Sequence, residues 1–315
     1  MLVLHILFVV VGLVVLTKAA DQFVLGAARI SLALRISAVV VGAVIVGFGT
    51  SAPEMLVSTL AALDGNAEVG LGNIVGSNVA NLTLVLGAAA LIVRVGIHDG
   101  VLRREAPLML GAVALFALLV QDGVAGWEAA VLLVVMVAVL TIIIRSGGLP
   151  DPELEEEVEE FADEAHPHPL KGEVVRTVIG LLGTLLGAQL LVTGAVEVAD
   201  AAGLSGGFVG FTLVAVGTSL PELVTTVAAA RAGETDLIVG NLLGSNIFNS
   251  LIVGATMGFA SGGLDAPKLL GIGVVMMVAI AGGLVVLMLA RRQLTRIEGG
   301  GLILAYGASV ALLGV

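Results

Sequence analysis

Two stretches of the chain, Gly49–Asn81 and Gly217–Asn249, are copies of one another at a constant offset of 168 residues. They align without a gap and agree at 14 of 33 positions, and both open on GTSxPE and close on GSNxxN. Each copy places a single carboxylate, Glu54 or Glu222, in an apolar run that holds no other charged side chain. This duplication constrains the fold strongly, because the chain must supply two equivalent halves.

The composition of the chain is that of a membrane protein. Hydrophobic residues make up 58% of its 315 positions, charged residues make up 12%, and the mean hydropathy is +1.13. Most of such a chain cannot face water, so we expect a polytopic helical membrane protein. Cysteine is absent, which excludes disulfides and thiolate metal sites. No Walker motif or dinucleotide fingerprint is present, so any transport is driven by a gradient.

Ten apolar runs approach the length needed to cross a hydrocarbon core of ~30 Å. The first lacks the basic residues that begin a signal peptide, so we interpret it as a span. Five runs fall in each half, which predicts a first repeat over 1–145, an acidic cytoplasmic linker over 146–173 and a second repeat over 174–315. The runs cover 2–16, 38–63, 69–93, 106–121, 124–144, 174–196, 206–230, 237–260, 269–290 and 301–314.

An odd number of spans in each half requires the two repeats to enter the membrane in opposite orientations. Basic residues concentrate on the cytoplasmic side of membrane proteins. When the connections alternate between two sides, Lys268 is the only basic residue on one side, and thirteen lie on the other. We therefore expect an all-α protein of the cell membrane, with ten transmembrane helices in two inverted-topology five-helix repeats and both termini outside. The thirteen residues are Lys18, Arg29, Arg35, Arg94, Arg103, Arg104, Arg145, Lys171, Arg176, Arg231, Arg291, Arg292 and Arg296.

The linker between the halves is strongly acidic. Nine of the 25 acidic residues of the chain lie between Asp151 and Glu164. They do not follow the ligand spacing of an EF-hand. We interpret the linker as a solvated loop, with a regulatory Ca²⁺ site as the alternative.

Each motif describes a helix that is interrupted within the membrane. Pro53 and Pro221 come directly before the two carboxylates, and a proline in a helix frees the carbonyl four residues earlier. A charge at mid-bilayer costs roughly 2.5–3.5 kcal/mol or more, so the carboxylate there faces a partner or a water-filled cavity. Freed carbonyls beside a carboxylate are typical of a transporter's cation site. The structural alternative is a proline kink with a hydrogen-bonded Glu.

Inverted repeats bring two motif helices together near the midplane, so Glu54 and Glu222 are expected to share one cavity. Two close carboxylates repel unless a cation or a proton lies between them. Ca²⁺ takes about six to eight oxygen ligands, and the carboxylates, the carbonyls of Thr50 and Thr218, and water can supply them. None of the four histidines lies in either motif, so the donors point to hard ions.

The GSN part of each motif adds neutral oxygen donors. Ser77 and Asn81 lie four residues apart, as do Ser245 and Asn249, so each pair is on one face of a helix. Neutral oxygens of this kind suit Na⁺.

A family resemblance is carried by the two motifs, GTSAPE…GNIVGSNVAN and GTSLPE…GNLLGSNIFN. They resemble the α-repeats of the sodium/calcium exchanger family, within the calcium/cation antiporter superfamily. The resemblance implies that Ca²⁺ and Na⁺ bind as transported substrates, with no cofactor, and that Glu54, Glu222, Thr50 and Thr218 hold Ca²⁺. The residues that it implies for the flanking Na⁺ sites are Gly47, Ser51, Ser77, Ala215, Ser219 and Ser245, with Asn81 and Asn249 at the centre.

One position departs from the family pattern. Many exchangers carry Asp in one repeat where this chain has Asn249, so the central position is an amide in both repeats. The two remaining acids neutralise one Ca²⁺, whereas three Na⁺ leave one positive charge uncompensated in a medium of low dielectric constant. The Ca²⁺ assignment is unaffected, and the counter-ion and the stoichiometry stay open.

We therefore expect a secondary antiporter, not an enzyme, that exchanges Ca²⁺ for Na⁺ by alternating access around a midplane carboxylate site. An H⁺/Ca²⁺ or K⁺-dependent exchanger is the alternative, because a buried carboxylate also binds protons. A passive cation channel fits less well, since paired carboxylates at one deep site bind too tightly for rapid throughput. A membrane metalloenzyme lacks the His or Asp to hold its metal. The expected partners are the two ions and the lipid bilayer, with no nucleic acid and no obligatory protein partner.

Overall fold

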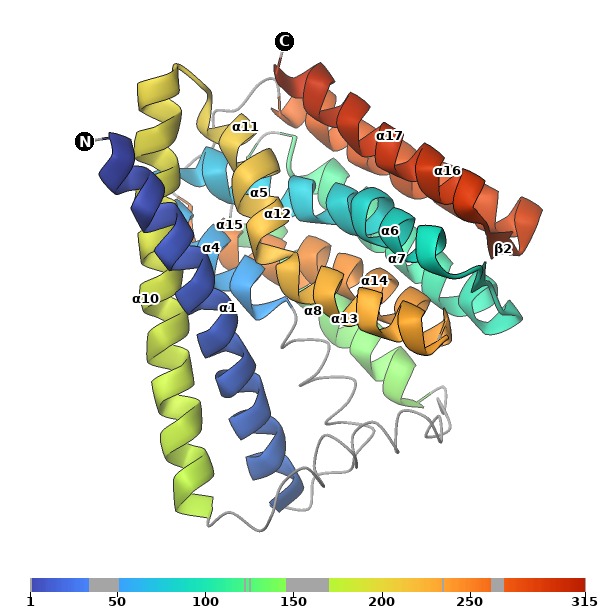
Figure 1. Cartoon of the computed structure of the whole chain (residues 1–315), viewed down its shortest axis with the longest axis horizontal. Coiled ribbons are helices and arrows are strands. Elements are labelled where there is room, and N and C mark those ends of the chain that lie inside the picture. The colour runs from blue at the N-terminus through green and yellow to red at the C-terminus, as the bar shows by residue number, and fades with distance from the viewer. Residues whose placement is uncertain are drawn as a thin grey trace.

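The computed structural model is almost entirely helical (Figure 1). It describes residues 2–33, 51–121, 123–124, 126–145, 170–233, 235–261 and 269–314. The predictions for Gly47 and Thr50, and most of those for the acidic linker, fall outside the described residues. The helix that follows the linker begins at Leu170, inside the range predicted as linker.

The first half contains helices, two π-helical turns and one short strand. Their bounds are α1 Leu2–Ala33, α4 Ala52–Leu63, α5 Ala67–Ala80, η2 Asn81–Val85, α6 Leu86–Ile92, β1 Val95–Gly96, η3 Val101–Glu105, α7 Ala106–Leu119 and α8 Gly126–Arg145.

The second half is built in the same way. Its elements are α10 Leu170–Ala202, α11 Gly206–Val209, η4 Gly210–Val214, α12 Ala215–Thr218, α13 Leu220–Ala232, α14 Thr235–Phe248, η5 Asn249–Val253, α15 Gly254–Ala260, η6 Leu269–Gly273, α16 Val274–Arg291, β2 Gln293–Leu294 and α17 Arg296–Gly314.

Helix boundaries repeat at the offset of the sequence duplication. The pairs α5 and α14, η2 and η5, α6 and α15, and η3 and η6 each begin and end 168 residues apart. The two long helices α1 and α10 also begin at this offset. Local structure is therefore duplicated together with the sequence, well beyond the two motifs.

Among the described residues, six helices are long and apolar enough to cross a membrane, which confirms a multi-pass membrane protein. A seventh arises if Gly206–Thr218 and Leu220–Arg231, which meet at 42°, are one bent span. The ten spans and the inverted relation of the halves stay predictions. The six helices are Leu2–Phe23, Ala67–Ile92, Leu170–Ala202, Ile238–Ala260, Leu269–Arg291 and Arg296–Gly314.

The helices α1 and α10 are longer than the runs 2–16 and 174–196 predicted there. They hold 32 and 33 residues. At ~1.5 Å per residue such helices are about 50 Å long, well beyond the thickness of a hydrocarbon core. They lie side by side at one edge of the bundle (Figure 1).

A seam of five glycines and Ala19, with His5 and Glu173 at its ends, joins these two helices and is here called the glycine seam. Positions 5, 12, 19 and 26 of α1 face positions 194, 187, 180 and 173 of α10, so the helices run antiparallel with a seven-residue repeat. A Cβ added at Gly12, Gly180, Gly187 or Gly194 would lie 2.5–2.7 Å from backbone atoms of the facing helix. Glycine is required there because the two backbones approach too closely for any side chain.

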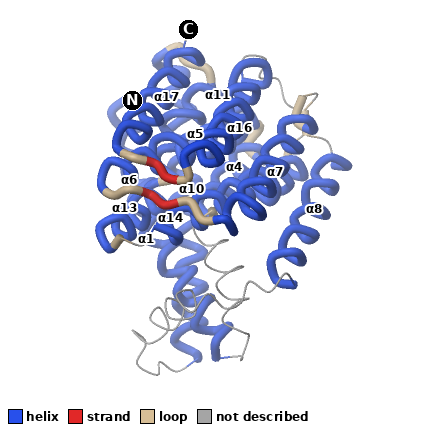
Figure 2. Tube along the Cα trace, turned by 90° about the vertical axis from the view of Figure 1, so that its right-hand side faces the viewer, coloured by secondary structure: helices blue, strands red, loops and turns tan. Residues whose placement is uncertain are grey.

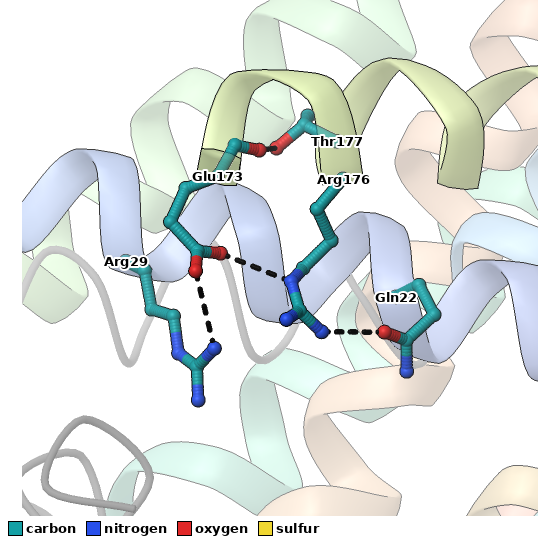
Figure 3. Close-up of polar contacts among 5 residues, drawn as sticks. All are labelled: Gln22, Arg29, Glu173, Arg176 and Thr177. Atoms are coloured by element: carbon teal, nitrogen blue, oxygen red, sulfur yellow. Dashed lines mark hydrogen bonds and ion pairs between the residues drawn. The ribbon is translucent and has the colours of Figure 1, made fainter. Parts of the chain in front are cut away.

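A buried ionic cluster closes one end of this seam (Figure 3). The Glu173 carboxylate lies between the guanidinium groups of Arg29, at 3.3 Å, and Arg176, at 3.2 Å. Arg176 also donates a hydrogen bond of 2.6 Å to the side-chain oxygen of Gln22. The cluster ties α1 to α10 through charge as well as through backbone contact.

A two-stranded clasp connects the two halves beside the start of α14. Strands β1 and β2 pair antiparallel, with Val95 opposite Leu294 (Figure 2). The Ile97 amide donates to the Arg292 carbonyl at 3.0 Å, and Arg292 adopts the left-handed conformation, with φ of +56°. The Arg292 side chain forms an ion pair with Asp99. This clasp joins the end of α6 to the connection between α16 and α17.

Candidate metal-ion site

Glu54 and Glu222 lie in the first turns of α4 and α13, and neither is exposed to solvent. Each helix begins with a proline in its first two positions, directly before the carboxylate. In the second half, α12 ends at Thr218 and α13 begins at Leu220, so the helix is interrupted at Ser219 as the motif predicts. The N-terminus of a helix favours a negative charge, which offsets part of the cost of burying the carboxylates.

The two carboxylates belong to one site. They lie close enough to interact electrostatically. The Ser219 hydroxyl of the second half donates to a carboxylate oxygen of Glu54 in the first half, at 3.4 Å. Across the same interface, the hydroxyl oxygens of Ser77 and Thr218 are 3.5 Å apart. The structure thus brings side chains of both copies into contact.

Several buried polar atoms at this site have no hydrogen-bond partner among the residues that the structure describes. They include both carboxylate oxygens of Glu222, one of Glu54, the Ser51 hydroxyl, and both amide atoms of Asn81 and of Asn249. Buried polar groups are normally satisfied, because an unpaired one costs free energy. A cluster of orphaned oxygens around two carboxylates fits the binding of cations with their waters.

The other predicted site residues that the structure describes are buried as well. Among them, Ser77, Asn81, Ala215 and Asn249 have no exposed surface, and the rest are at most 3% exposed. The described part of the chain holds no group of three or more His, Cys, Asp or Glu side chains that could bind a metal. Among the described residues, the ligands available to a cation here are the two carboxylates and neutral oxygens.

The helices of the GSN motifs are not regular. A π-helical turn begins at Asn81 and another at Asn249, the central amides of the two copies. Single π-helical turns are frequent at functional sites, because they change the direction of a side chain and loosen the backbone hydrogen bonds. The four-residue spacing that places Ser77 and Asn81 on one face thus holds only up to the start of this turn.

Sequence reasoning missed Asn73, which belongs to the site's surroundings. Its side chain is fully buried and makes hydrogen bonds to the Glu54 carbonyl, to Ser58 and to Thr218. A signal was present, because Asn73 lies four residues before Ser77 in the GNxxGSN sequence, and Asn241 occupies the same place in the second copy.

Comparison with known proteins relates this chain to a family of transporters. The family model described as sodium/calcium exchanger protein matches residues 4–145 and 173–315. A putative antiporter CaxA of Alkalimonas amylolytica is 38% identical over 95% of both chains, and the sodium/calcium exchanger MaX1 of Methanosarcina acetivorans is 28% identical over 80% of this chain and 82% of its own. A solved structure of the sodium-calcium exchanger NCX_Mj, soaked with Na⁺ and Sr²⁺, superposes with a TM-score of 0.67 at 30% identity and 99% coverage of both chains.

Proposed function

Because the chain belongs to the sodium/calcium exchanger protein family, we propose that it exchanges Ca²⁺ for Na⁺ across a membrane by alternating access. Its membership and its fold make it a cation antiporter rather than an enzyme. The transported ions are its substrates, and the proposal requires no cofactor. The proposal assigns the midplane site to Glu54, Glu222, Thr50, Thr218, Ser51, Ser219, Ser77, Ser245, Asn81, Asn249, Gly47 and Ala215.

The observation that carries this proposal is the set of orphaned oxygens around two fully buried carboxylates. Two carboxylates offset the charge of one Ca²⁺. Their mutual repulsion is relieved when the ion binds between them, which favours binding. The hydroxyls and the amides of Asn81 and Asn249 supply neutral oxygens for Na⁺. Competition between the two ions for shared ligands then couples their movements.

The architecture supports an inverted pair of repeats, 1–145 and 174–315, joined by the linker 146–173. The helices α1 and α10 occupy the same place in the two copies and run antiparallel. Such a pair is expected when one repeat is turned over relative to the other. In the proposed topology, both termini lie outside the cell membrane and the linker lies in the cytoplasm.

H⁺ and K⁺ are the two alternatives to Na⁺ alone as the driving ion. A proton can replace Na⁺ on a buried carboxylate, and K⁺ can add to the exchange. The neutral hydroxyl and amide oxygens around Glu54 and Glu222 favour Na⁺ over H⁺, because a proton needs a single basic atom whereas Na⁺ needs several oxygen ligands.

The test is Ca²⁺ uptake into proteoliposomes of the purified protein, with Na⁺, K⁺ or H⁺ gradients imposed one at a time. We expect an outward Na⁺ gradient to drive Ca²⁺ accumulation. Accumulation that responds only to a proton gradient would assign the H⁺/Ca²⁺ alternative. Ca²⁺ movement that merely follows its own gradient, whichever other ion is present, would assign a passive channel.

A further inference from the structure

Asn73 of α5 connects the two halves of the protein beside the carboxylates. Its amide nitrogen lies 3.3 Å from the Glu54 carbonyl and 3.0 Å from the Ser58 hydroxyl, both on α4. Its amide oxygen lies 3.0 Å from the hydroxyl of Thr218, which ends α12 in the second half. Asn73, Ser58 and Glu54 have no exposed surface, and Thr218 is 1% exposed. One side chain therefore contacts α4 of the first half and α12 of the second.

The chemistry of these partners fixes the direction of each hydrogen bond. The Glu54 carbonyl can only accept, so the amide nitrogen of Asn73 must face α4. The Ser58 hydroxyl donates to the Gly70 carbonyl at 3.1 Å and is free to accept from Asn73. The amide oxygen of Asn73 consequently faces Thr218, so the hydroxyl of Thr218 is the donor in the 3.0 Å hydrogen bond between them.

This direction has a consequence for the ion site. Once the Thr218 hydroxyl donates to Asn73, its oxygen lone pairs are available to a cation or to the Ser77 hydroxyl, 3.5 Å away. Without Asn73, the hydroxyl retains the Ala215 carbonyl of its own helix, at 3.2 Å, as an acceptor. The contact across the two halves would be lost while the helix kept its internal bond.

We propose that Asn73 is a positioning residue for cation binding, which holds Thr218 of the second half against the Glu54 segment of the first. The inference rests on the proposed function, in which Thr218 belongs to the ion site. Asn73 acts through Thr218 and through the Glu54 backbone rather than as an ion ligand. It thereby sets the distance between ligands contributed by the two copies.

The second copy provides a matched control. Asn241 occupies the place of Asn73 but is partly exposed, and it makes no side-chain hydrogen bond with any residue that the structure describes. Among the described residues, the hydroxyl of Thr226, which takes the place of Ser58, is buried without a partner. The hydrogen bonds that Asn73 makes to α4 thus have no equivalent between Asn241 and α13 in the described part of the chain, although the two motifs share the GNxxGSN sequence.

A double-mutant cycle tests the inference. Ca²⁺ alone is titrated calorimetrically into the purified full-length protein in detergent, as wild type, Asn73→Leu, Thr218→Val and the double variant. A hydrogen bond of ordinary strength predicts an increase of about 2- to 10-fold in the Ca²⁺ Kd for Asn73→Leu. In the Thr218→Val background the same substitution should change the Kd less than about 2-fold, because the residue through which Asn73 acts is already altered. Asn241→Leu should leave the Kd within about 2-fold of wild type.

Several results would overturn the proposal: an unchanged Kd in Asn73→Leu, an equal factor in both backgrounds, or an equal effect of Asn241→Leu. If Asn73→Leu does not fold, Asn73→Ala carries the same cycle without added bulk, since Ser58 and Thr218 keep their carbonyl acceptors. Ca²⁺ flux of the wild type, measured after the same purified protein is reconstituted into proteoliposomes, tests the proposed function separately from the role of Asn73. Absence of Na⁺-driven flux rejects the proposed function, whereas the binding cycle alone decides the role of Asn73.

Discussion

The Glu173 carboxylate of α10 lies 3.3 Å from the Arg29 guanidinium of α1, and the two side chains are only 5% and 11% exposed. Arg176 contacts the same carboxylate from its other side (Figure 3). The negative charge of Glu173 thus lies between the positive charges of Arg29 and Arg176, at the end of the glycine seam. A buried charge with two partners of opposite sign is costly to remove, because its removal leaves the partners uncompensated.

We therefore predict that Glu173→Gln lowers the free energy of unfolding by about 3 kcal/mol, the usual effect of breaking a buried ion pair. Thermal unfolding of the purified protein in detergent measures the change. The matched control is Glu197→Gln on the same helix, where the carboxylate is 52% exposed and lies 3.7 Å from His5. Its effect should stay below about 1 kcal/mol. Equal melting temperatures for the two variants would contradict the role given to Glu173.

A second prediction concerns the paired carboxylates. Glu54→Gln and Glu222→Gln should each abolish Ca²⁺ transport in a folded protein, because each removes half of the charge that offsets the ion's loss of hydration. Ca²⁺ uptake into proteoliposomes measures this. Glu68→Gln is the control, since Glu68 accepts a hydrogen bond from the Gly207 amide, 3.3 Å away, and has no place in the proposed site. Near-normal uptake by either site variant, or equal loss in the control, would remove the carboxylates from the site.

A third prediction uses the amide at the centre of the second copy. Asn249→Asp adds a third acid beside Glu54 and Glu222. If the new carboxylate binds Na⁺, the Na⁺ dependence of Ca²⁺ flux should become steeper at fixed pH. If it retains a proton, that dependence should stay the same and the flux should become sensitive to external pH. Unchanged Na⁺ and pH dependence, with normal expression, would mean that Asn249 only packs against its neighbours.

Much of the site could be predicted from the sequence, because its signals are local. A proline next to a lone carboxylate in an apolar run predicted an interrupted helix at each motif, and the structure has the interruption at Ser219 in the second half, with Glu54 and Glu222 in the first turns of α4 and α13. The π-helical turns at Asn81 and Asn249 could not be predicted in this way. A π-helical turn differs from an α-helical turn by one additional residue, and the pattern of hydrophobic residues does not reveal it. The contacts of Asn73 depend on the meeting of two distant segments, which spacing alone does not define.

The lengths of α1 and α10 were missed for a different reason. An apolar run in the sequence predicts only the part of a helix that lies in the lipid core. The predicted run therefore ended before the charged residues Lys18, Asp21 and Arg29. The helix continues past them to Ala33, because contact with α10 and the pairing of Arg29 with Glu173 stabilise the extension. The length of α1 thus depends on its packing against α10 and cannot be predicted from composition.

A fourth prediction follows from the odd number of spans in each repeat. A cysteine at Glu157 in the linker and a cysteine added after Val315 should react with membrane-impermeant reagents from opposite sides. The chain has no cysteine of its own, so the reagents label only the introduced cysteines. A cysteine at Lys171 should label from the same side as Glu157. Labelling of the linker and the C-terminus from one side would contradict the inverted arrangement.

A fifth prediction concerns the clasp of β1 and β2. A hydrogen bond from Arg292, with the charge of that residue, holds the pKa of Asp99 below its ordinary value of 3.8. A lowered pKa means that the ionised carboxylate stabilises the clasp above about pH 4, and that this stabilisation is lost as the pH falls below that value. Hydrogen exchange of the Ile97 amide, corrected for its intrinsic pH dependence, should therefore accelerate in acid. Asp99→Asn should exchange faster at neutral pH and lose the additional acid response. The same acid response in that variant would assign it to another group.

The glycine seam between α1 and α10 has a consequence for how this chain can vary in evolution. The facing positions are copies of one ancestral helix that packs against its own duplicate, so a mutation in one copy meets an unchanged partner in the other. A larger residue at Gly187 requires backbone movement at Leu16 and Gly12, where no side chain can be shortened to compensate. We expect related sequences to keep small residues at both ends of the facing pairs Gly12–Gly187 and Ala19–Gly180, or to change both together, long after the exposed faces of the two helices have diverged.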